Sequence, residues 1–388
     1  MGSKPRKLGA RATAGGLLAC LVLSACGSGD QDAQADKTDE ARTPSATASA
    51  SADTNCKPSR DGRITPVCNL QSPEDFQLLP GSENQMVVSL GNGPVYKGPS
   101  SLALLDTDTK AVTKLAVQEK PLKGWGDAGC TPPEGEFSFH GLNVQKLKDG
   151  TVRVLVVNHS KRESVELFQL DRSTSRPKLM WRGCVKTPPE SYINDVAGLP
   201  DGGFVVTVMA SAKDMQPEGF DSIFSGKNTG PVYRWSPTGG VRTLPGTMKP
   251  GPNGVQVSAD GRTMHFAEYT GFKMARYDLE AEKMTGEANL DIVPDNVSMG
   301  PDGELVMVGV ATLAETRECP ESGLTKCDHP VRVQAVDPDS LKVTDIPVDG
   351  LNVLRGATVA VPAGDALYVS SVANDRIVRF TYDGLKGK

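Results

Sequence analysis

Apolar and polar residues alternate with a period of two in many short segments of this chain. Examples are Val152–Val157, Phe204–Val208, Val232–Trp235, Leu305–Val308 and Ile377–Tyr382. Pro-Asp-Gly, Ala-Asp-Gly and Lys-Asp-Gly sequences, which favour tight turns, lie between such segments. Period-two alternation between turns is typical of β-strands, and no long stretch has the period of a helix. The pattern therefore predicts an all-β protein.

One unit recurs six times: a polar or glycine-containing pair, an alternating strand, a turn and a strongly apolar strand. The pairs begin between 42 residues (253 to 295) and 66 residues (74 to 140) apart, which suits four-stranded propeller blades with variable outer loops. We therefore predict a six-bladed β-propeller, since a large sandwich would not need the repeat. The pairs are Glu74-Asp75, His140-Gly141, Asn194-Asp195, Asn253-Gly254, Asp295-Asn296 and Arg355-Gly356.

The first residues have the pattern of an export signal. Basic residues between Lys4 and Arg11 precede a small, apolar run over residues 12–23, which is too short to span a bilayer permanently. The run closes on Leu-Ser-Ala followed by Cys26, which looks like the cleavage box of a bacterial lipoprotein. We expect residues 1–25 to be removed and Cys26 to be lipidated; a plain signal peptide cut nearby is the alternative.

Residues 26–54 contain almost no apolar side chains beyond Ala and are rich in Ser, Thr, Ala, Asp and Gln. Such a segment cannot bury enough surface to offset its ordering entropy, so we expect a flexible tether. Residues 55–388 would form the propeller. The lipid and the tether would hold it at the cell envelope, on the extracytoplasmic side of a bacterial membrane.

The net charge of −5 provides no basic footprint, which argues against nucleic acid as a partner. Of the eight cysteines, Cys20 lies in the signal and Cys26 would carry the lipid, so six remain. An even number in an exported chain indicates disulfides, although many pairings are possible. Cys56–Cys68 and Cys319–Cys327 are plausible local loops, which would leave Cys130–Cys184. A zinc cluster is the rival interpretation, and the lack of any CxxC pair disfavours it.

The innermost strand of each propeller blade lines the central channel, so the pairs that begin the repeats should converge at one mouth. Oxygen donors with few nitrogens suit Ca²⁺, which takes about 6–8 oxygen ligands, better than Mg²⁺ or Zn²⁺. For any single pair, turn formation would be the simpler explanation. Six pairs at the same phase of the repeat favour a calcium site instead. The candidate donors are Glu74, Asn194, Asn253, Asp295 and Asn296, with Asp75, Asp195 and His140 beside them.

Around these residues the chain resembles the paraoxonase/arylesterase family of calcium-dependent lactonases, from about Cys68 to Phe380. The segment VLVVNHSKRESVELF is the most specific match, because neither propeller geometry nor calcium binding would require it. The matching segments are SPEDFQLLPG (72–81), FSFHGLNVQ (137–145), VLVVNHSKRESVELF (154–168), INDVAGLPDG (193–202), PNGVQVSADGRTMHFAE (252–268), PDNVSMGPDGELVMVG (294–309) and GATVA (356–360).

The resemblance implies two calcium ions and a pair of histidines, His140 and His159. The second, structural ion would be held by Asp75, Asp195 and the backbone oxygen of Leu142. The catalytic ion would be held by the five candidate donors named above: Glu74, Asn194, Asn253, Asp295 and Asn296.

A lactone or ester hydrolase is the function that this resemblance implies. Calcium would polarise the substrate carbonyl, and His140, relaying its proton to His159, would activate water. Asp295 is the alternative base. Two other functions stay open: a calcium-stabilised binding or scaffold propeller without chemistry, and a hydrolase of sugar lactones or phosphoesters. The closed ring is expected to be a monomer, with a small molecule as its partner in the channel.

The chain departs from the family pattern in three places. The last strand lacks the cysteine that the family joins to its N-terminal one, so Cys68 must pair elsewhere. Met307 and Ala311 stand at positions of aromatic and histidine pocket residues, which leaves the pocket shape open. An insertion with Cys319 and Cys327 follows. His265 and His329 are expected to be structural, and no G-x-S-x-G or H-E-x-x-H motif is present.

Overall fold

The computed structural model describes residues 56–91, 99–216, 219–316, 330–348, 351, 354 and 356–381. The chain divides into two compact units, residues 1–52 and 53–388, and every described residue belongs to the second. The expected signal and the whole of the expected tether, including Cys26, lie outside the described residues. Within the described ranges, α1 (Phe220–Ile223) is a short α-helix, residues 313–316 are also helical, and no helix there is long and apolar enough to cross a membrane.

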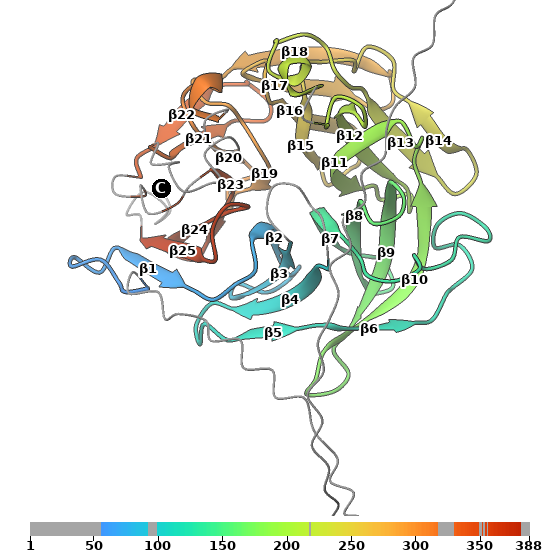
Figure 1. Ribbon diagram of the computed structural model, residues 1–388, viewed down its shortest axis with the longest axis horizontal. Coiled ribbons are helices and arrows are strands. Elements are labelled where there is room, and N and C mark those ends of the chain that lie inside the picture. The colour runs from blue at the N-terminus through green and yellow to red at the C-terminus, as the bar shows by residue number, and fades with distance from the viewer. Residues whose placement is uncertain are drawn as a thin grey trace, which may run out of the picture. The chain divides into compact units, whose positions relative to one another are not determined.

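The strands form six sheets, and the predicted six-bladed propeller is confirmed (Figure 1). The first blade contains β2 (Pro73–Leu78), β3 (Gln85–Leu90), β4 (Ser101–Asp106) and β5 (Val112–Lys114). The second contains β7 (Phe139–Lys146), β8 (Val152–Asn158), β9 (Ser164–Asp171) and β10 (Lys178–Lys186), with β6 (Ala116–Glu119) added parallel to β10. The third contains β11 (Ser191–Gly198), β12 (Phe204–Ser211), β13 (Val232–Ser236) and β14 (Gly240–Thr243).

The remaining three blades have the same antiparallel order. The fourth contains β15 (Pro252–Val257), β16 (Thr263–Glu268), β17 (Lys273–Asp278) and β18 (Lys283–Asn289). The fifth contains β19 (Val297–Met299), β20 (Leu305–Gly309), β21 (Arg332–Val336) and β22 (Val343–Ile346). The sixth contains β23 (Ala357–Ala363), β24 (Ala366–Ser371), β25 (Ile377–Thr381) and β1 (Ile64–Val67).

The ring is closed by β1, which comes from the start of the propeller and completes the last blade. It pairs antiparallel with β25, from Ile64 opposite Phe380 to Val67 opposite Ile377. The disulfide Cys56–Cys68 brackets this strand, and this answers where Cys68 pairs. The second predicted disulfide in the described residues, Cys130–Cys184, is also present, whereas Cys319 and Cys327 lie outside the described ranges.

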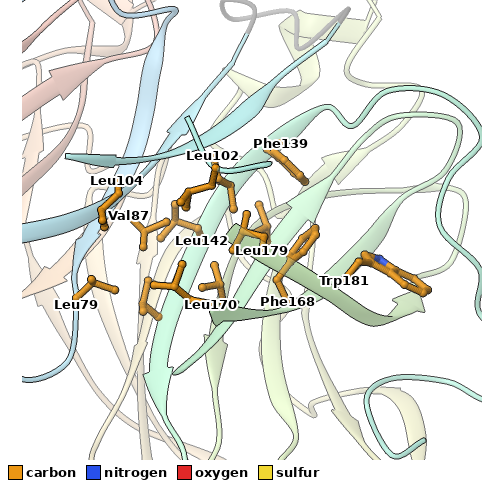
Figure 2. Packing of buried hydrophobic residues seen from close by; sticks show 14 of the residues in the cluster. Leu79, Val87, Leu102, Leu104, Phe139, Leu142, Phe168, Leu170, Leu179 and Trp181 are labelled. Atoms are coloured by element: carbon orange, nitrogen blue, oxygen red, sulfur yellow. The ribbon is translucent and has the colours of Figure 1, made fainter. Parts of the chain in front are cut away.

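Apolar cores lie between successive blades, because each sheet is packed against a neighbour on both faces. Figure 2 shows one of them, in which Val87 and Leu104 of the first blade face Leu142, Phe168 and Leu179 of the second. All these side chains are buried. Removing such apolar surface from water contributes roughly 25 cal/mol per Å², so the interblade cores hold the ring together and fix the inner strands.

The inner strands β2, β7, β11, β15, β19 and β23 contact one another in sequence, and β23 returns to β2 (Figure 1). These are the strands that carry or directly follow the six recurring pairs. The architecture therefore brings the starts of all six repeats to the centre.

Candidate active site

A β-bulge marks the beginning of most inner strands. The register of β7 with β8 slips between Phe139 and Leu142, and similar slips occur in β2, β11, β15 and β23. A bulge sets two residues opposite one and re-aims their side chains. Four of these bulges contain the pairs that begin with Glu74, His140, Asn194 and Asn253. Strict alternation would fix the face on which each residue of a pair lies, so the bulge is a local reason that the polar side chains of these pairs can turn toward the centre.

Hydrogen bonds join these pairs across blades. Asn296 donates its Nδ2–H to Glu74 Oε1 at 2.8 Å, although the two residues are 222 positions apart. Thr358 Oγ1 donates to the backbone oxygen of Glu74 at 2.6 Å and accepts, through its own carbonyl, the backbone N–H of Asn296 at 2.9 Å. The first, fifth and sixth blades are therefore fixed relative to one another at the site.

The glycines of two pairs are required by close approach of neighbouring inner strands. A Cβ at Gly141 would lie 2.6 Å from the backbone oxygen of Asn194. A Cβ at Gly254 would lie 2.3 Å from the backbone nitrogen of Val297 and 2.6 Å from Asn296 Cα. Only glycine fits these positions without moving a backbone, so the glycines set the spacing of the polar side chains.

Four side-chain oxygens at this centre are buried and have no hydrogen-bond partner among the described residues: Glu74 Oε2, Asn194 Oδ1, Asn253 Oδ1 and Asn296 Oδ1. A buried polar atom without a partner costs about 1–3 kcal/mol, so four together indicate a missing partner of positive charge. They belong to four of the five candidate calcium donors. The described residues contain no group of three or more His, Cys, Asp or Glu placed to hold a metal, so the donor set depends on its amides.

The charges at the centre also call for a cation. Burial raises the pKa of Glu74 to about 7. Burial and the negative charge of Glu74 raise the pKa of Asp75 and Asp295 well above the usual range. Burial and Asp75 do the same to Asp195. Among the described residues no salt bridge joins these four carboxyls to a lysine or arginine, so they share a buried region without a basic side chain to neutralise them.

Asp75 and Asp195, the predicted ligands of the structural ion, each join two inner strands. The backbone N–H of Leu142 donates to Asp75 Oδ2 at 2.7 Å, and that of Val255 donates to Asp195 Oδ2 at 2.8 Å. The side chain of Leu142 is buried in the interblade core of Figure 2. The structure thus brings all three predicted residues to the channel wall.

The two predicted histidines lie side by side and extend into a third group that the sequence did not suggest. His140 Nδ1 is 3.0 Å from His159 Nε2, and His159 Nδ1 is 2.9 Å from Glu163 Oε1. Burial lowers the pKa of His140 to about 3 and also lowers that of His159, so both rings are neutral near pH 7. Tyr192 stacks on His159 with ring centroids 4.3 Å apart.

His140 also faces the donor cluster, since its Nε2 lies 3.6 Å from Glu74 Oε1. The sequence did not indicate a role for Glu163 or Tyr192, although Glu163 lies inside the segment with the most specific family match. The sequence signal for Glu163 was its position four residues after His159, across one short turn.

A cavity of about 150 Å³ opens above this cluster. His140, Asn194, Asn253 and the partly buried Asp295 contribute its polar wall. The rest of the lining is largely apolar: Met209, Met215, Ile223, Phe224, Val293 and Val310.

The pocket shape, which the sequence left open at positions 307 and 311, is set by other residues. Met307 is fully buried in an interblade core with Met274 and Leu305, and Ala311 is not part of the cavity lining. Val293 and Val310 line the cavity instead.

Comparison with known proteins shows which family the chain belongs to. Residues 90–309, more than half of the chain, match the family described as SMP-30/gluconolactonase/LRE-like region. The chain belongs to this family.

Several known proteins resemble the chain at low identity. Human serum paraoxonase/arylesterase 1 is 24% identical over 312 residues, covering 76% of this chain and 83% of the human protein. Among solved structures, the Malassezia sympodialis allergen Mala s 1 has a TM-score of 0.50 at 13% identity, covering 83% of this chain and 96% of the allergen. A calcium-binding regucalcin from Agrobacterium tumefaciens has a TM-score of 0.46 at 15% identity, covering 81% and 92%. These structural likenesses concern the fold alone.

Proposed function

We propose that this protein is a calcium-dependent hydrolase of lactones or esters. The observation that carries the proposal is the set of four buried oxygens without partners next to a histidine pair, since Asn194, Asn253 and His140 of this cluster line one cavity. The distant relationship to paraoxonase/arylesterase enzymes supports the same reaction class.

The residues present fit a calcium ion in charge and in donor chemistry. Two carboxylates would offset the +2 charge, and amide oxygens would complete a shell of hard ligands. Bound there, calcium would supply a positive charge that polarises the substrate carbonyl. A second, structural ion would use Asp75, Asp195 and the backbone oxygen of Leu142. The catalytic ion would use Glu74, Asn194, Asn253, Asp295 and Asn296.

His140 is the proposed base. Its ring is neutral, lies on the cavity wall and can accept a proton from water. An isolated ring with so low a pKa would be a weak base, so the partner His159 and the carboxylate beyond it matter. Asp295 remains the alternative base, because it lies on the same wall and burial keeps its pKa raised.

The cavity lining favours an uncharged substrate with an apolar acyl or aryl part. None of the described residues that line it is a lysine or arginine, which a phosphorylated substrate would require. The methionine and valine side chains of the lining cannot hydrogen-bond to the hydroxyls of a sugar lactone, whereas they can pack against an acyl chain or an aryl ring.

The expected lipid anchor at Cys26 would place this activity at the outer side of a bacterial membrane. Incorporation of a labelled fatty acid that disappears in Cys26→Ala would support the anchor. Equal incorporation in both proteins would remove it.

The test of function is hydrolysis of one aliphatic lactone, one aryl ester and one aryl phosphotriester by the full-length protein, with calcium and after EGTA. Calcium-dependent turnover of the lactone or the aryl ester is expected. No turnover, together with a melting temperature lowered by EGTA, would mean a propeller that uses calcium only for stability.

A further inference from the structure

We infer that Glu163 is a positioning residue that orders the protons of the histidine pair, so that the lone pair of His140 Nε2 faces the donor cluster. The inference rests on the proposed function for its catalytic meaning, but the proton order itself is a property of the protein alone.

The local fold brings Glu163 back onto His159. Both lie in the connection between β8, which ends at Asn158, and β9, which begins at Ser164. Lys161 in this connection has φ of 62°, a left-handed conformation that turns the chain sharply. The side chains that meet are largely buried, with exposed fractions of 6% for His159 and 13% for Glu163.

The carboxylate is also held from the next blade. The backbone N–H of Ile193 donates to Glu163 Oε2 at 3.2 Å, while both carboxylate oxygens lie within 3.0 Å of His159 Nδ1. Tyr192 covers the flat face of the His159 ring. These contacts restrain both the carboxylate and the imidazole, so neither can rotate freely.

Only one arrangement of hydrogens satisfies the series of hydrogen bonds from Glu163 through His159 to His140. An ionised carboxylate only accepts, so His159 Nδ1 carries the hydrogen, and a neutral imidazole has just one. His159 Nε2 then accepts, and its partner at 3.0 Å, His140 Nδ1, must donate. The lone pair of His140 is consequently on Nε2, the atom that lies 3.6 Å from Glu74 Oε1.

This order has a chemical consequence. When His140 Nε2 takes a proton from water, an O–H bond breaks, an N–H bond forms, and the hydroxide attacks the carbonyl carbon. The ring becomes an imidazolium whose Nδ1–H remains bonded to His159. The negative charge of Glu163, transmitted through the oriented His159, stabilises this cation, as a carboxylate does behind a catalytic histidine.

The proton order can be read directly. The full-length protein labelled with ¹⁵N at histidine contains only four such residues, so its long-range ¹H–¹⁵N correlations can be assigned with His140→Gln and His159→Gln variants. In the calcium-loaded protein we expect both rings as the Nδ1–H tautomer. An Nε2–H tautomer on either ring, or a doubly protonated ring at pH 7.5, would overturn the inference.

Glu163→Gln tests the cause. The amide has the same shape, can still accept the Ile193 N–H, and now presents N–H to His159 Nδ1, so the order should reverse and place a hydrogen on His140 Nε2. We expect kcat to fall at least about 10²-fold with KM little changed. Glu190→Gln, which removes an exposed carboxylate just before β11, is the matched control and should change neither tautomers nor rates.

Unchanged tautomers in Glu163→Gln would refute the assignment, and if this variant does not fold, the wild-type spectrum still decides. The expected tautomers in a protein that hydrolyses no member of the substrate panel would leave the proton order standing and remove the proposed function.

Discussion

Replacing Glu74 by Gln should have opposite effects on stability with and without calcium. Glu74 is 1% exposed; its Oε1 accepts from Asn296, and its Oε2 has no described hydrogen-bond partner. The amide of Gln keeps the volume and the hydrogen bond to Asn296 but removes the negative charge. In the absence of metal the buried negative charge has no counter-charge and destabilises the fold, whereas with calcium the carboxylate is a ligand.

The size of the effect follows from the pKa of Glu74, which burial raises from 4.5 to about 7. Because the folded pKa lies above the unfolded one, the charged group destabilises the fold. The cost is absent below pH 4.5, grows between pH 4.5 and 7, and is constant above. At about 1.36 kcal/mol per pKa unit it reaches about 3 kcal/mol at pH 8.

The assay is thermal unfolding of wild type and Glu74→Gln at pH 8 and pH 4.5. In EGTA at pH 8 the variant should melt several degrees higher, and this advantage should vanish at pH 4.5. With calcium at about 1,000 times Kd at pH 8 the order should reverse, because wild type then gains about 4.1 kcal/mol, more than the cost of the buried charge, and the variant has lost a charged ligand.

Glu119→Gln, on the exposed strand β6, controls for the loss of a surface carboxylate and should behave as wild type. A Glu74→Gln protein that is less stable than wild type in EGTA at pH 8 would refute the reasoning. So would a difference between the two proteins that calcium does not alter.

Three further predictions concern the base, a disulfide and a glycine. His140→Ala should lower kcat about 10²–10⁴-fold in a protein that still folds; unchanged turnover in a folded variant would exclude His140 as base. Replacing Cys130 and Cys184 by Ser should cost about 4 kcal/mol in urea unfolding, from the 54-residue separation of the pair, and a loss below about 1 kcal/mol would contradict this. Gly254→Ala should weaken calcium binding in titration calorimetry, because the new Cβ would meet the Val297 backbone; wild-type affinity would show that the strands can separate at no cost.

The fold could be predicted because the sequence pattern of one blade recurs six times along the chain. Each repeat combines a polar pair, a turn and an apolar strand, so a repeat with an ambiguous pattern can be assigned by comparison with the other copies. The site followed from the same repetition, since pairs at one phase must meet at the centre of a ring. The four buried oxygens without partners belong to residues that this argument had already selected.

Features that depend on one side chain's direction were beyond the sequence. Glu163 meets His159 only because Lys161 takes a left-handed conformation, which alternation does not reveal. Met307, on β20, points into a core, whereas Val310, just after the end of that strand, lines the cavity, and alternation alone does not reveal this difference. The closing pair of β1 and β25 joins Ile64 to Phe380 across nearly the whole domain, and no local pattern marks such a partner.

That closure has a consequence for how the protein is made. A chain that folds as it is synthesised exposes the edge of β1 until β25 exists, and an unpaired strand edge invites pairing with other chains. Such long-range pairing is also intrinsically slow to form. The bond Cys56–Cys68, by contrast, can form early, because its partners are 12 residues apart. The disulfide would hold β1 in its native conformation until β25 is synthesised and pairs with it, which is the period in which aggregation is most favoured.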